Sequence, residues 1–220
     1  MRQKYIQFAF NDSFSEFLKT VPYFPKHENI IIEAGTPLIK REGIGVIKKM
    51  RAFWKGKICA DIKIVDGAYE EVLMAKQAGA YSVTALGTNS FESLKIFVET
   101  CKKYNIVSVV DMINAEKPLN LLWKSGIVPD VVLIHRGRDE ENSFGKIIQY
   151  KEIAKIKGKY STLLGAAGGI DRKEMQTALF NNADLVVVNV VKPNSHLTGI
   201  VLDNNFGDDV NKYLQSFKFS

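Results

Sequence analysis

The sequence predicts a single (β/α)8 barrel, the TIM-barrel fold, over residues 1–220. Eight short β-like runs recur at fairly regular spacing, and a longer segment of helical character follows each of them. Strict alternation of strands and helices indicates a parallel sheet. Eight such units in 220 residues favour a closed barrel over an open doubly wound sheet. Because no linker or low-complexity tract interrupts the pattern, we expect one domain.

The predicted strands are short apolar runs rich in β-branched and aromatic residues. In chain order they are residues 5–10, 30–33, 58–62, 81–85, 106–110, 131–134, 161–164 and 185–188. The predicted helices separate these runs and carry apolar residues at helical spacing. In chain order they are residues 13–20, 40–54, 68–79, 90–104, 117–125, 145–157, 172–181 and 208–217.

Composition indicates a cytoplasmic protein that does not cross a membrane. Hydrophobic residues make up 46% of the chain, which is enough for one substantial core. No uninterrupted apolar stretch approaches the roughly 20 residues of a membrane span, and the N-terminus lacks a signal pattern. The isolated cysteines, Cys59 and Cys101, are typical of core residues in a reducing compartment.

The charge balance allows an anionic ligand but does not require one. The formal charge is +6, with 30 Lys and Arg against 24 Asp and Glu, and a positive field draws anions toward a cleft. Residues 48–57 mix cations with aromatics, as nucleic-acid binders do. We interpret this run as the basic last turn of a helix that ends near Gly56, so no nucleic-acid partner is expected.

Three charged residues, Asp61, Lys63 and Asp66, mark the corner between a predicted strand and the next helix. Side chains alternate along a strand, so Asp61 and Lys63 point the same way, and Asp66 follows in the turn. The carboxylates keep Lys63 protonated, ready to stabilise an oxyanion, and they can also bind a divalent cation. The alternative is a surface ion-pair cluster without a catalytic role.

Polar or glycine residues stand at or near the carboxyl end of every predicted strand. In chain order they are Asn11 with Asp12, Glu33, Asp61 with Lys63, Thr84, Asp111, His135, Gly168 with Gly169, and Asn189. In a barrel these positions share one face, which is where active sites form. This convergence favours catalysis over the surface ion-pair cluster.

The chemistry of these residues suggests individual roles. Glu33 and Asp61 offer the oxygen ligands that Mg²⁺ prefers, although a salt bridge between Glu33 and Lys63 is the alternative. His135 is the natural proton shuttle, or else a hydrogen-bonded histidine at a strand end. Arg138 either meets a substrate oxygen or pairs with Asp139 or Glu141.

The glycine-rich residues 165–171 open a helix after the seventh strand, where barrels often bind phosphate. A plain tight turn is the alternative. Residues 43–48 lack the third glycine of a dinucleotide-binding loop and follow no strand, so they predict no dinucleotide site.

The chain resembles the orotidine 5′-monophosphate decarboxylase superfamily in residues 33–39, 61–67, 78–80, 135–139 and 167–170. Within it, the sequence is most similar to the branch of 3-hexulose-6-phosphate synthase and 3-keto-L-gulonate-6-phosphate decarboxylase. The pair of motifs Glu-x-Gly-Thr-Pro-Leu and Asp-x-Lys-x-x-Asp is typical of that branch. Orotidine chemistry is not expected, because the decarboxylase that names the superfamily lacks the Gly-Thr-Pro-Leu turn.

The resemblance implies a Mg²⁺-dependent lyase acting on a phosphorylated sugar. It implies that Glu33 and Asp61 hold the metal, Lys63 stabilises an enediolate and His135 moves protons. It also implies a homodimer with shared active sites, in which the Asp66 segment reaches the partner's site. The residues expected to contact substrate are Asn11, Asp111, Arg138, Gly168, Gly169 and Asn189.

Few residues decide between the two reactions of this branch. Asp111 and the Gly168-Gly169 turn resemble the synthase, which condenses formaldehyde with ribulose 5-phosphate or reverses that reaction. Arg138 resembles the decarboxylase of 3-keto-L-gulonate 6-phosphate. We favour the synthase. A class I aldolase with Lys63 as Schiff base ranks lower, because flanking carboxylates oppose the lowered amine pKa which that chemistry requires.

Two positions depart from the pattern of this branch. Asn11 stands where the first strand normally ends in aspartate, and Asn189-Val190 stand where the eighth normally ends in Gly-Arg. Loss of a charge-assisted phosphate contact weakens binding, and Lys192 is a candidate replacement. These departures support a further alternative, which is a diverged paralogue that binds a ligand or partner without efficient turnover.

Overall fold

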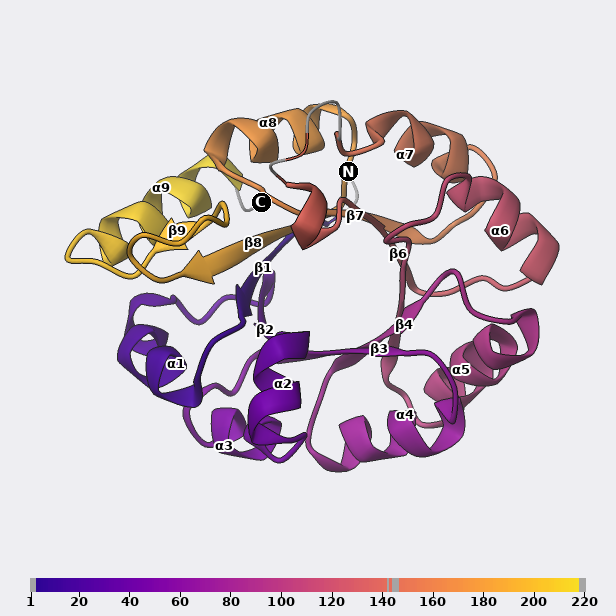
Figure 1. Ribbon diagram of the computed structural model, residues 1–220, viewed down its shortest axis with the longest axis horizontal. Helices are drawn as coiled ribbons and strands as arrows, with labels where there is room; N and C mark the ends of the chain where they lie inside the picture. Colours follow the sequence, from indigo (N-terminus) through magenta and orange to yellow (C-terminus); the bar gives the residue numbers. More distant parts are fainter. Residues whose placement is uncertain (1–2, 142, 144–146, 218–220) are drawn as a thin grey trace.

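The computed structural model describes residues 3–141, 143 and 147–217, and their strands form the parallel barrel that the sequence predicts (Figure 1). The strands are β1 (Tyr5–Phe10), β2 (Ile30–Ala34), β3 (Lys57–Ile64), β4 (Ser82–Leu86), β5 (Val107–Asp111), β6 (Val131–His135), β7 (Leu163–Ala167) and β8 (Leu185–Val191). Each strand pairs with the next, and β1 also pairs with β8. The closed (β/α)8 barrel is therefore confirmed.

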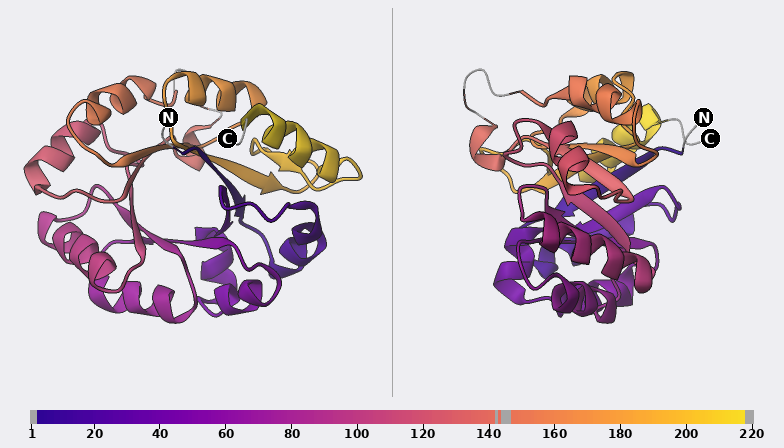
Figure 2. Two further views of the ribbon diagram at one scale, coloured as in Figure 1. Left: turned by 180° about the vertical axis from the view of Figure 1, so that it is seen from behind. Right: turned by 90° about the vertical axis from the view of Figure 1, so that its right-hand side faces the viewer.

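Helices surround the barrel in the views from both faces (Figures 1 and 2). They are α1 (Phe14–Thr20), α2 (Thr36–Glu42), α3 (Val46–Phe53), α4 (Ala68–Gln77), α5 (Phe91–Lys103), α6 (Pro118–Ser125), α7 (Tyr150–Lys157), α8 (Arg172–Phe180) and α9 (Phe206–Phe217). Side chains cap several of their N-termini: Ser13, Ser90 and Asp171 accept backbone N–H bonds from the first turns of α1, α5 and α8. Among the helices that the structure describes, no candidate membrane-spanning segment is present.

The sequence interpretation is wrong about residues 40–54, which form two helices instead of one. Helix α2 begins four residues earlier, at Thr36 with Pro37 in its first turn, and ends at Glu42. The next residue, Gly43, has a φ of 75°, which residues with a side chain rarely adopt. Helix α3 starts after Gly45. The apolar periodicity runs through both helices, so it does not reveal the break.

Other differences concern the ends of elements. Strand β7 begins two residues after the predicted start and runs to Ala167, and β8 extends to Val191. A short strand that the sequence did not predict, β9 (Ile200–Val201), pairs with β8. The predicted start of the seventh helix, at 145, lies outside the described residues, and α7 begins at Tyr150.

Alternation along the strands decides which side chains reach the barrel interior. In β1, Phe8 and Phe10 belong to the core between barrel and helices, whereas Ala9 belongs to an interior cluster. Other interior members are Ile31, Cys59, Val109, Leu133 and Val187. Two residues further along each of these strands lie Asn11, Glu33, Asp61, Asp111, His135 and Asn189. The interior is thus apolar at depth and becomes polar at its carboxyl end.

Candidate active site

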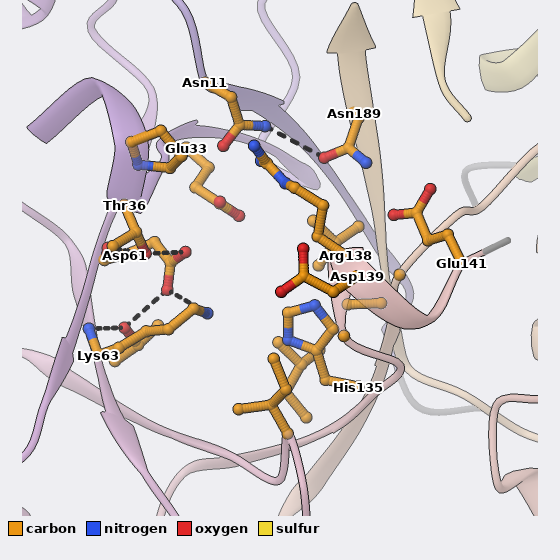
Figure 3. Close-up of a pocket in the computed structure, with 18 of the residues that line it drawn as sticks. Asn11, Glu33, Thr36, Asp61, Lys63, His135, Arg138, Asp139, Glu141 and Asn189 are labelled. Carbon is orange, nitrogen blue, oxygen red and sulfur yellow. Dashed lines mark hydrogen bonds and ion pairs between the residues drawn. The ribbon is translucent and has the colours of Figure 1, made fainter. Parts of the chain in front are cut away.

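A cavity of about 440 Å³ opens at the carboxyl ends of the strands (Figure 3). The predicted site residues that line it are Asn11, Glu33, Asp61, Lys63, His135, Arg138, Gly168 and Asn189. Residues that were not among the predicted site residues also line it, among them Gln7, Thr36, Thr84 and Glu141. The convergence expected from the strand ends is therefore found.

A bulge in β3 sets the position of Lys63. The register with β4 shifts between Ala60 and Ile64, and Lys63 itself has a φ of 56°, which is uncommon for a residue other than glycine. Its backbone N–H donates to Thr84 Oγ1 (2.9 Å), and that hydroxyl donates to Asp61 Oδ1 (2.8 Å). Thr84 thus fixes both the lysine and the carboxylate beside it.

The Lys63 ammonium is held between two carboxylates. Its Nζ lies 3.1 Å from Asp61 Oδ1 and 2.6 Å from Asp111 Oδ2. Burial alone would lower the pKa of Lys63, but the charges of Asp61 and Asp111 outweigh it and raise the pKa above its ordinary value. The ammonium is therefore permanent at physiological pH, which suits stabilisation of an oxyanion and opposes Schiff-base chemistry.

Asp111 joins Lys63 to His135. His135 Nδ1 lies 2.9 Å from Asp111 Oδ2, and the backbone N–H of Ile113 donates to Oδ1 (3.0 Å). Burial would raise the pKa of Asp111, but the charge and hydrogen bond of His135, together with Lys63, hold it well below its usual range. An ionised carboxylate only accepts hydrogen bonds, so Nδ1 carries the proton and Nε2 is available to a ligand.

The position of Asp111 differs from the one expected of a substrate ligand. Its side chain is 0% exposed and is absent from the cavity lining. Lys63, His135 and the Ile113 amide enclose the carboxylate. In this structure Asp111 therefore positions the two groups that face the cavity.

Glu33 and Asp61 form a pair of carboxylates on the other side of Lys63. Glu33 is 6% exposed and accepts a hydrogen bond from Gln7 Nε2. Burial, followed by the neighbouring charge of Asp61, raises the pKa of Glu33 to about 8. Thr36 Oγ1 lies 2.8 Å from Asp61 Oδ2. The salt bridge between Glu33 and Lys63, which was the alternative role of Glu33, is absent among the ion pairs of the described residues.

This carboxylate pair fits Mg²⁺ better than a metal that demands a complete set of protein ligands. In the described ranges, no cluster of three or more histidine, cysteine or carboxylate side chains is arranged to hold a metal. Mg²⁺ is commonly bound by one or two carboxylates and takes its remaining ligands from water and substrate.

The two positions that depart from the family pattern contact each other. Asn11 Nδ2 donates to Asn189 Oδ1 (3.2 Å) across the β1–β8 pairing (Figure 3), and Asn189 Nδ2 donates to Thr198 O (3.2 Å). A Cβ on Gly35 would overlap Asn11 Oδ1. The side-chain amides of Asn11 and Asn189 are therefore compatible with each other. Gly35, in the turn before α2, leaves room for the amide of Asn11.

Of the three further charged residues Arg138, Lys192 and Asp66, Arg138 alone lines the cavity. Arg138 lines the cavity (Figure 3), and in the described part of the chain no ion pair joins it to Asp139 or Glu141. Lys192, the candidate replacement for the missing arginine, pairs instead with Asp12 (3.4 Å) and Glu16 (3.2 Å) and does not line the cavity. Asp66 is exposed after β3 and is likewise absent from the lining.

The glycine turn after β7 has the backbone geometry of a binding loop. Gly168 and Gly169 have φ values of 96° and 63°, and a Cβ on Gly168 would overlap the carbonyl of Arg136. Gly168 lines the cavity, and Gly169 is the next residue of the same turn. Asp171 caps α8, which follows this turn.

Comparison with known proteins agrees with this architecture. A family model described as "Orotidine 5'-phosphate decarboxylase / HUMPS family" matches residues 6–189. The chain belongs to this family. The matched range includes Glu33, Asp61, Lys63 and His135.

Curated relatives of this family member are longer proteins. The chain is 38% identical over 170 residues to "Bifunctional enzyme Fae/Hps" of Methanocella arvoryzae, a match that covers 74% of this chain and 42% of that protein. A protein of the same name from Methanocaldococcus jannaschii is 32% identical over 212 residues, which covers 95% of this chain and 54% of that protein. The chain thus spans about half the length of the curated relatives that it matches.

Solved structures of the family share the fold. The crystal structure of 3-hexulose-6-phosphate synthase from Salmonella typhimurium has a TM-score of 0.83 and 25% identity, and the match covers 97% of this chain and 98% of that one. A crystal structure of KGPDC from Streptococcus mutans has a TM-score of 0.77 and 15% identity, with coverage of 99% and 98%. The latter match supports the fold alone.

Sequence reasoning missed several residues that shape the site. Gln7 was not noticed, although a polar residue inside an apolar predicted strand was a usable signal. Thr84 was noticed only as a polar residue of the fourth predicted strand. Thr36 was noticed only as part of a turn. Arg136 was noticed only within the motif at residues 135–139, and Glu141 only as a possible partner of Arg138. Their contacts with the β7 turn and the loop after β8 could not be predicted, because they depend on how three separate loops pack.

Proposed function

We propose that this chain is a 3-hexulose-6-phosphate synthase-like aldehyde-lyase that condenses formaldehyde with ribulose 5-phosphate, or catalyses the reverse reaction. The observation that carries the proposal is the line formed by Lys63, Asp111 and His135, with an ammonium and an imidazole on one buried carboxylate. The relatives named Fae/Hps and the synthase structure from Salmonella typhimurium support the same reaction.

In this proposal His135 Nε2 removes a proton from the carbon next to the substrate ketone. The electrons shift onto the ketone oxygen and give an enediolate, whose negative charge the Lys63 ammonium stabilises. The enediolate carbon then attacks the formaldehyde carbon, and the new alkoxide takes up a proton. Asp111 keeps the His135 tautomer fixed throughout, since it accepts from Nδ1.

We further propose that Glu33 and Asp61 hold Mg²⁺ at the mouth of the barrel. When bound, the metal polarises the ketone and so makes the neighbouring C–H more acidic. We also propose that the phosphorylated sugar contacts Asn11, Arg138, Gly168, Gly169 and Asn189. A cytoplasmic location of the protein stays a prediction.

The raised pKa of Glu33 predicts that the metal-free protein loses stability as pH rises from about 4.5 to about 8. The folded state keeps a proton on Glu33 that the unfolded state releases in this range, so the free energy of unfolding falls with rising pH. Mg²⁺ competes with that proton, and we expect it to raise the melting temperature more at pH 8 than at pH 6. Thermal unfolding with Mg²⁺ or EDTA at both pH values measures this.

Glu33→Gln is the matched variant for that measurement, because it keeps the shape and removes the titration. It should lose most of the Mg²⁺ effect and of the pH dependence in this range. An equal Mg²⁺ effect in wild type and variant would rule out Glu33 as a ligand.

The proposed homodimer predicts complementation between two inactive variants. Lys63→Ala and Asp66→Ala should each be inactive alone. In a mixed dimer, however, one site combines Lys63 of one chain with the partner subunit's Asp66. Co-expression should therefore restore activity, to about one quarter of wild type for random pairing. Activity that stays at the level of the separate variants would mean that Asp66 does not act across an interface.

A second candidate function is decarboxylation of 3-keto-L-gulonate 6-phosphate, favoured by the Arg138 side chain in the cavity. An assay of formaldehyde consumption with ribulose 5-phosphate and Mg²⁺, with and without EDTA, tests the synthase. CO₂ release from 3-keto-L-gulonate 6-phosphate tests the decarboxylase. If neither substrate turns over in folded protein, the chain is a ligand-binding paralogue, and the synthase proposal fails.

A further inference from the structure

The side chain of Arg136 contacts one face of the Gly168-Gly169 turn after β7. Arg136 Nη2 donates to the carbonyl oxygens of Gly168 (3.0 Å) and Gly169 (3.3 Å). In a trans peptide the N–H points opposite to the carbonyl, so the N–H groups of Gly169 and Ile170 point away from Arg136. Arg136 thus fixes the turn and adds positive charge behind it.

A carboxylate lies on the same turn. Glu141 follows the 3-10 turn Arg138–Glu140, and its Oε2 accepts the backbone N–H of Thr198 in the loop after β8 (3.2 Å). Its Cγ and Cδ pack against Gly169, since a Cβ built there would lie 3.2 Å from both. Glu141 also lines the cavity beside Asn189 (Figure 3). The carboxylate therefore bridges the loops after β7 and β8.

Barrels commonly bind a substrate phosphate between these two loops. We propose that Glu141 occupies the phosphate subsite in the ligand-free protein and that a sugar phosphate binds by displacing its carboxylate. This inference rests on the proposed function in so far as the substrate is phosphorylated. It makes Glu141 a residue that determines specificity.

The negative charge of Glu141 affects which anionic ligands bind at the turn. An anion that approaches the turn meets the like charge of Glu141, which weakens its binding. The segment Asn189-Val190 supplies no cation at the end of β8 to compensate. A free phosphate lacks other contacts, whereas a sugar phosphate also engages Lys63 and His135. The site therefore discriminates against phosphate alone and favours ligands that carry both a phosphate and a sugar that reaches Lys63 and His135.

Phosphate binding by wild type and Glu141→Gln tests the proposal, with inorganic phosphate as probe and isothermal titration calorimetry as readout. Glutamine keeps the shape and an acceptor for the Thr198 N–H, so the fold is preserved. We expect Glu141→Gln to bind phosphate about tenfold more tightly, because one like charge is removed. Glu92→Gln in the first turn of α5, on the other side of the barrel (Figure 1), makes the same change in net charge and should match wild type.

An affinity of Glu141→Gln equal to or weaker than that of wild type would overturn the inference, and so would absence of phosphate binding in both proteins. An equal gain in Glu92→Gln would also overturn it, because net charge alone would then explain the effect. The readout needs no turnover. If Glu141→Gln tightens phosphate binding while formaldehyde is not consumed, the synthase proposal fails and this inference stands. If formaldehyde is consumed but Glu141→Gln binds phosphate no more tightly than wild type, the synthase proposal stands and this inference fails.

Discussion

Lys63→Ala is expected to lower the turnover number by at least about 10³-fold, the largest effect of any single substitution in this chain. Lys63 is the cation that two buried carboxylates hold in the cavity, with Nζ 3.1 Å from Asp61 and 2.6 Å from Asp111. Alanine removes the charge that stabilises the enediolate and leaves both carboxylates to repel it. Formaldehyde consumption under saturating ribulose 5-phosphate measures the loss.

A lysine on the same strand provides the control. Lys57 begins β3 at the opposite end of the barrel, where its Nζ donates to Glu28 O (2.7 Å). Lys57→Ala should keep a turnover number close to that of wild type. If Lys63→Ala retained activity within about tenfold of wild type while folded, as judged by circular dichroism, the proposed enediolate role would be wrong.

Asp111→Asn should affect activity and stability together. We expect the turnover number to fall by about 10²-fold, because the amide holds neither the Lys63 ammonium nor the His135 tautomer as the carboxylate does. The free energy of unfolding should fall by about 3 kcal/mol, since a buried ion-pair network loses its central charge. Enzyme assays and urea unfolding at pH 7 measure the two effects.

The pH dependence identifies the source of that stability loss. The pKa of Asp111 is lower in the folded protein than its ordinary value of 3.8, so its contribution is present above that value and fades as pH falls below it. The difference in unfolding free energy between wild type and Asp111→Asn should therefore shrink below about pH 4. A difference that is constant down to pH 3 would indicate a packing defect instead.

Asp130→Asn separates stability from catalysis. Asp130 accepts hydrogen bonds from the backbone N–H (2.8 Å) and the hydroxyl (2.7 Å) of Ser108, and it precedes β6 at the end of the barrel opposite the cavity. This variant should lose stability with little change in turnover number. Wild-type turnover in Asp111→Asn would instead contradict the positioning role of Asp111.

The sequence by itself determined the barrel and the face at which the charged residues of the cavity meet. Alternating strands and helices specify a parallel barrel, and in such a barrel the carboxyl ends of all strands meet at one face. Glu33, Asp61, Lys63 and His135 could therefore be placed together without any knowledge of their distances. The missed break between α2 and α3 shows the limit of this reasoning, because apolar periodicity continues across Gly43 and Gly45.

Tertiary structure alone decided which side chains touch. Asp111 was expected to meet the substrate, yet the pairing of β5 with β6 and the bulge in β3 bring Lys63 and His135 onto it and bury it. The contact between Asn11 and Asn189 requires closure of β1 against β8, 178 residues apart in the chain. Glu141 reaches Thr198 only because separate loops pack at one edge of the mouth. Such contacts depend on register and loop geometry, which local residue patterns do not encode.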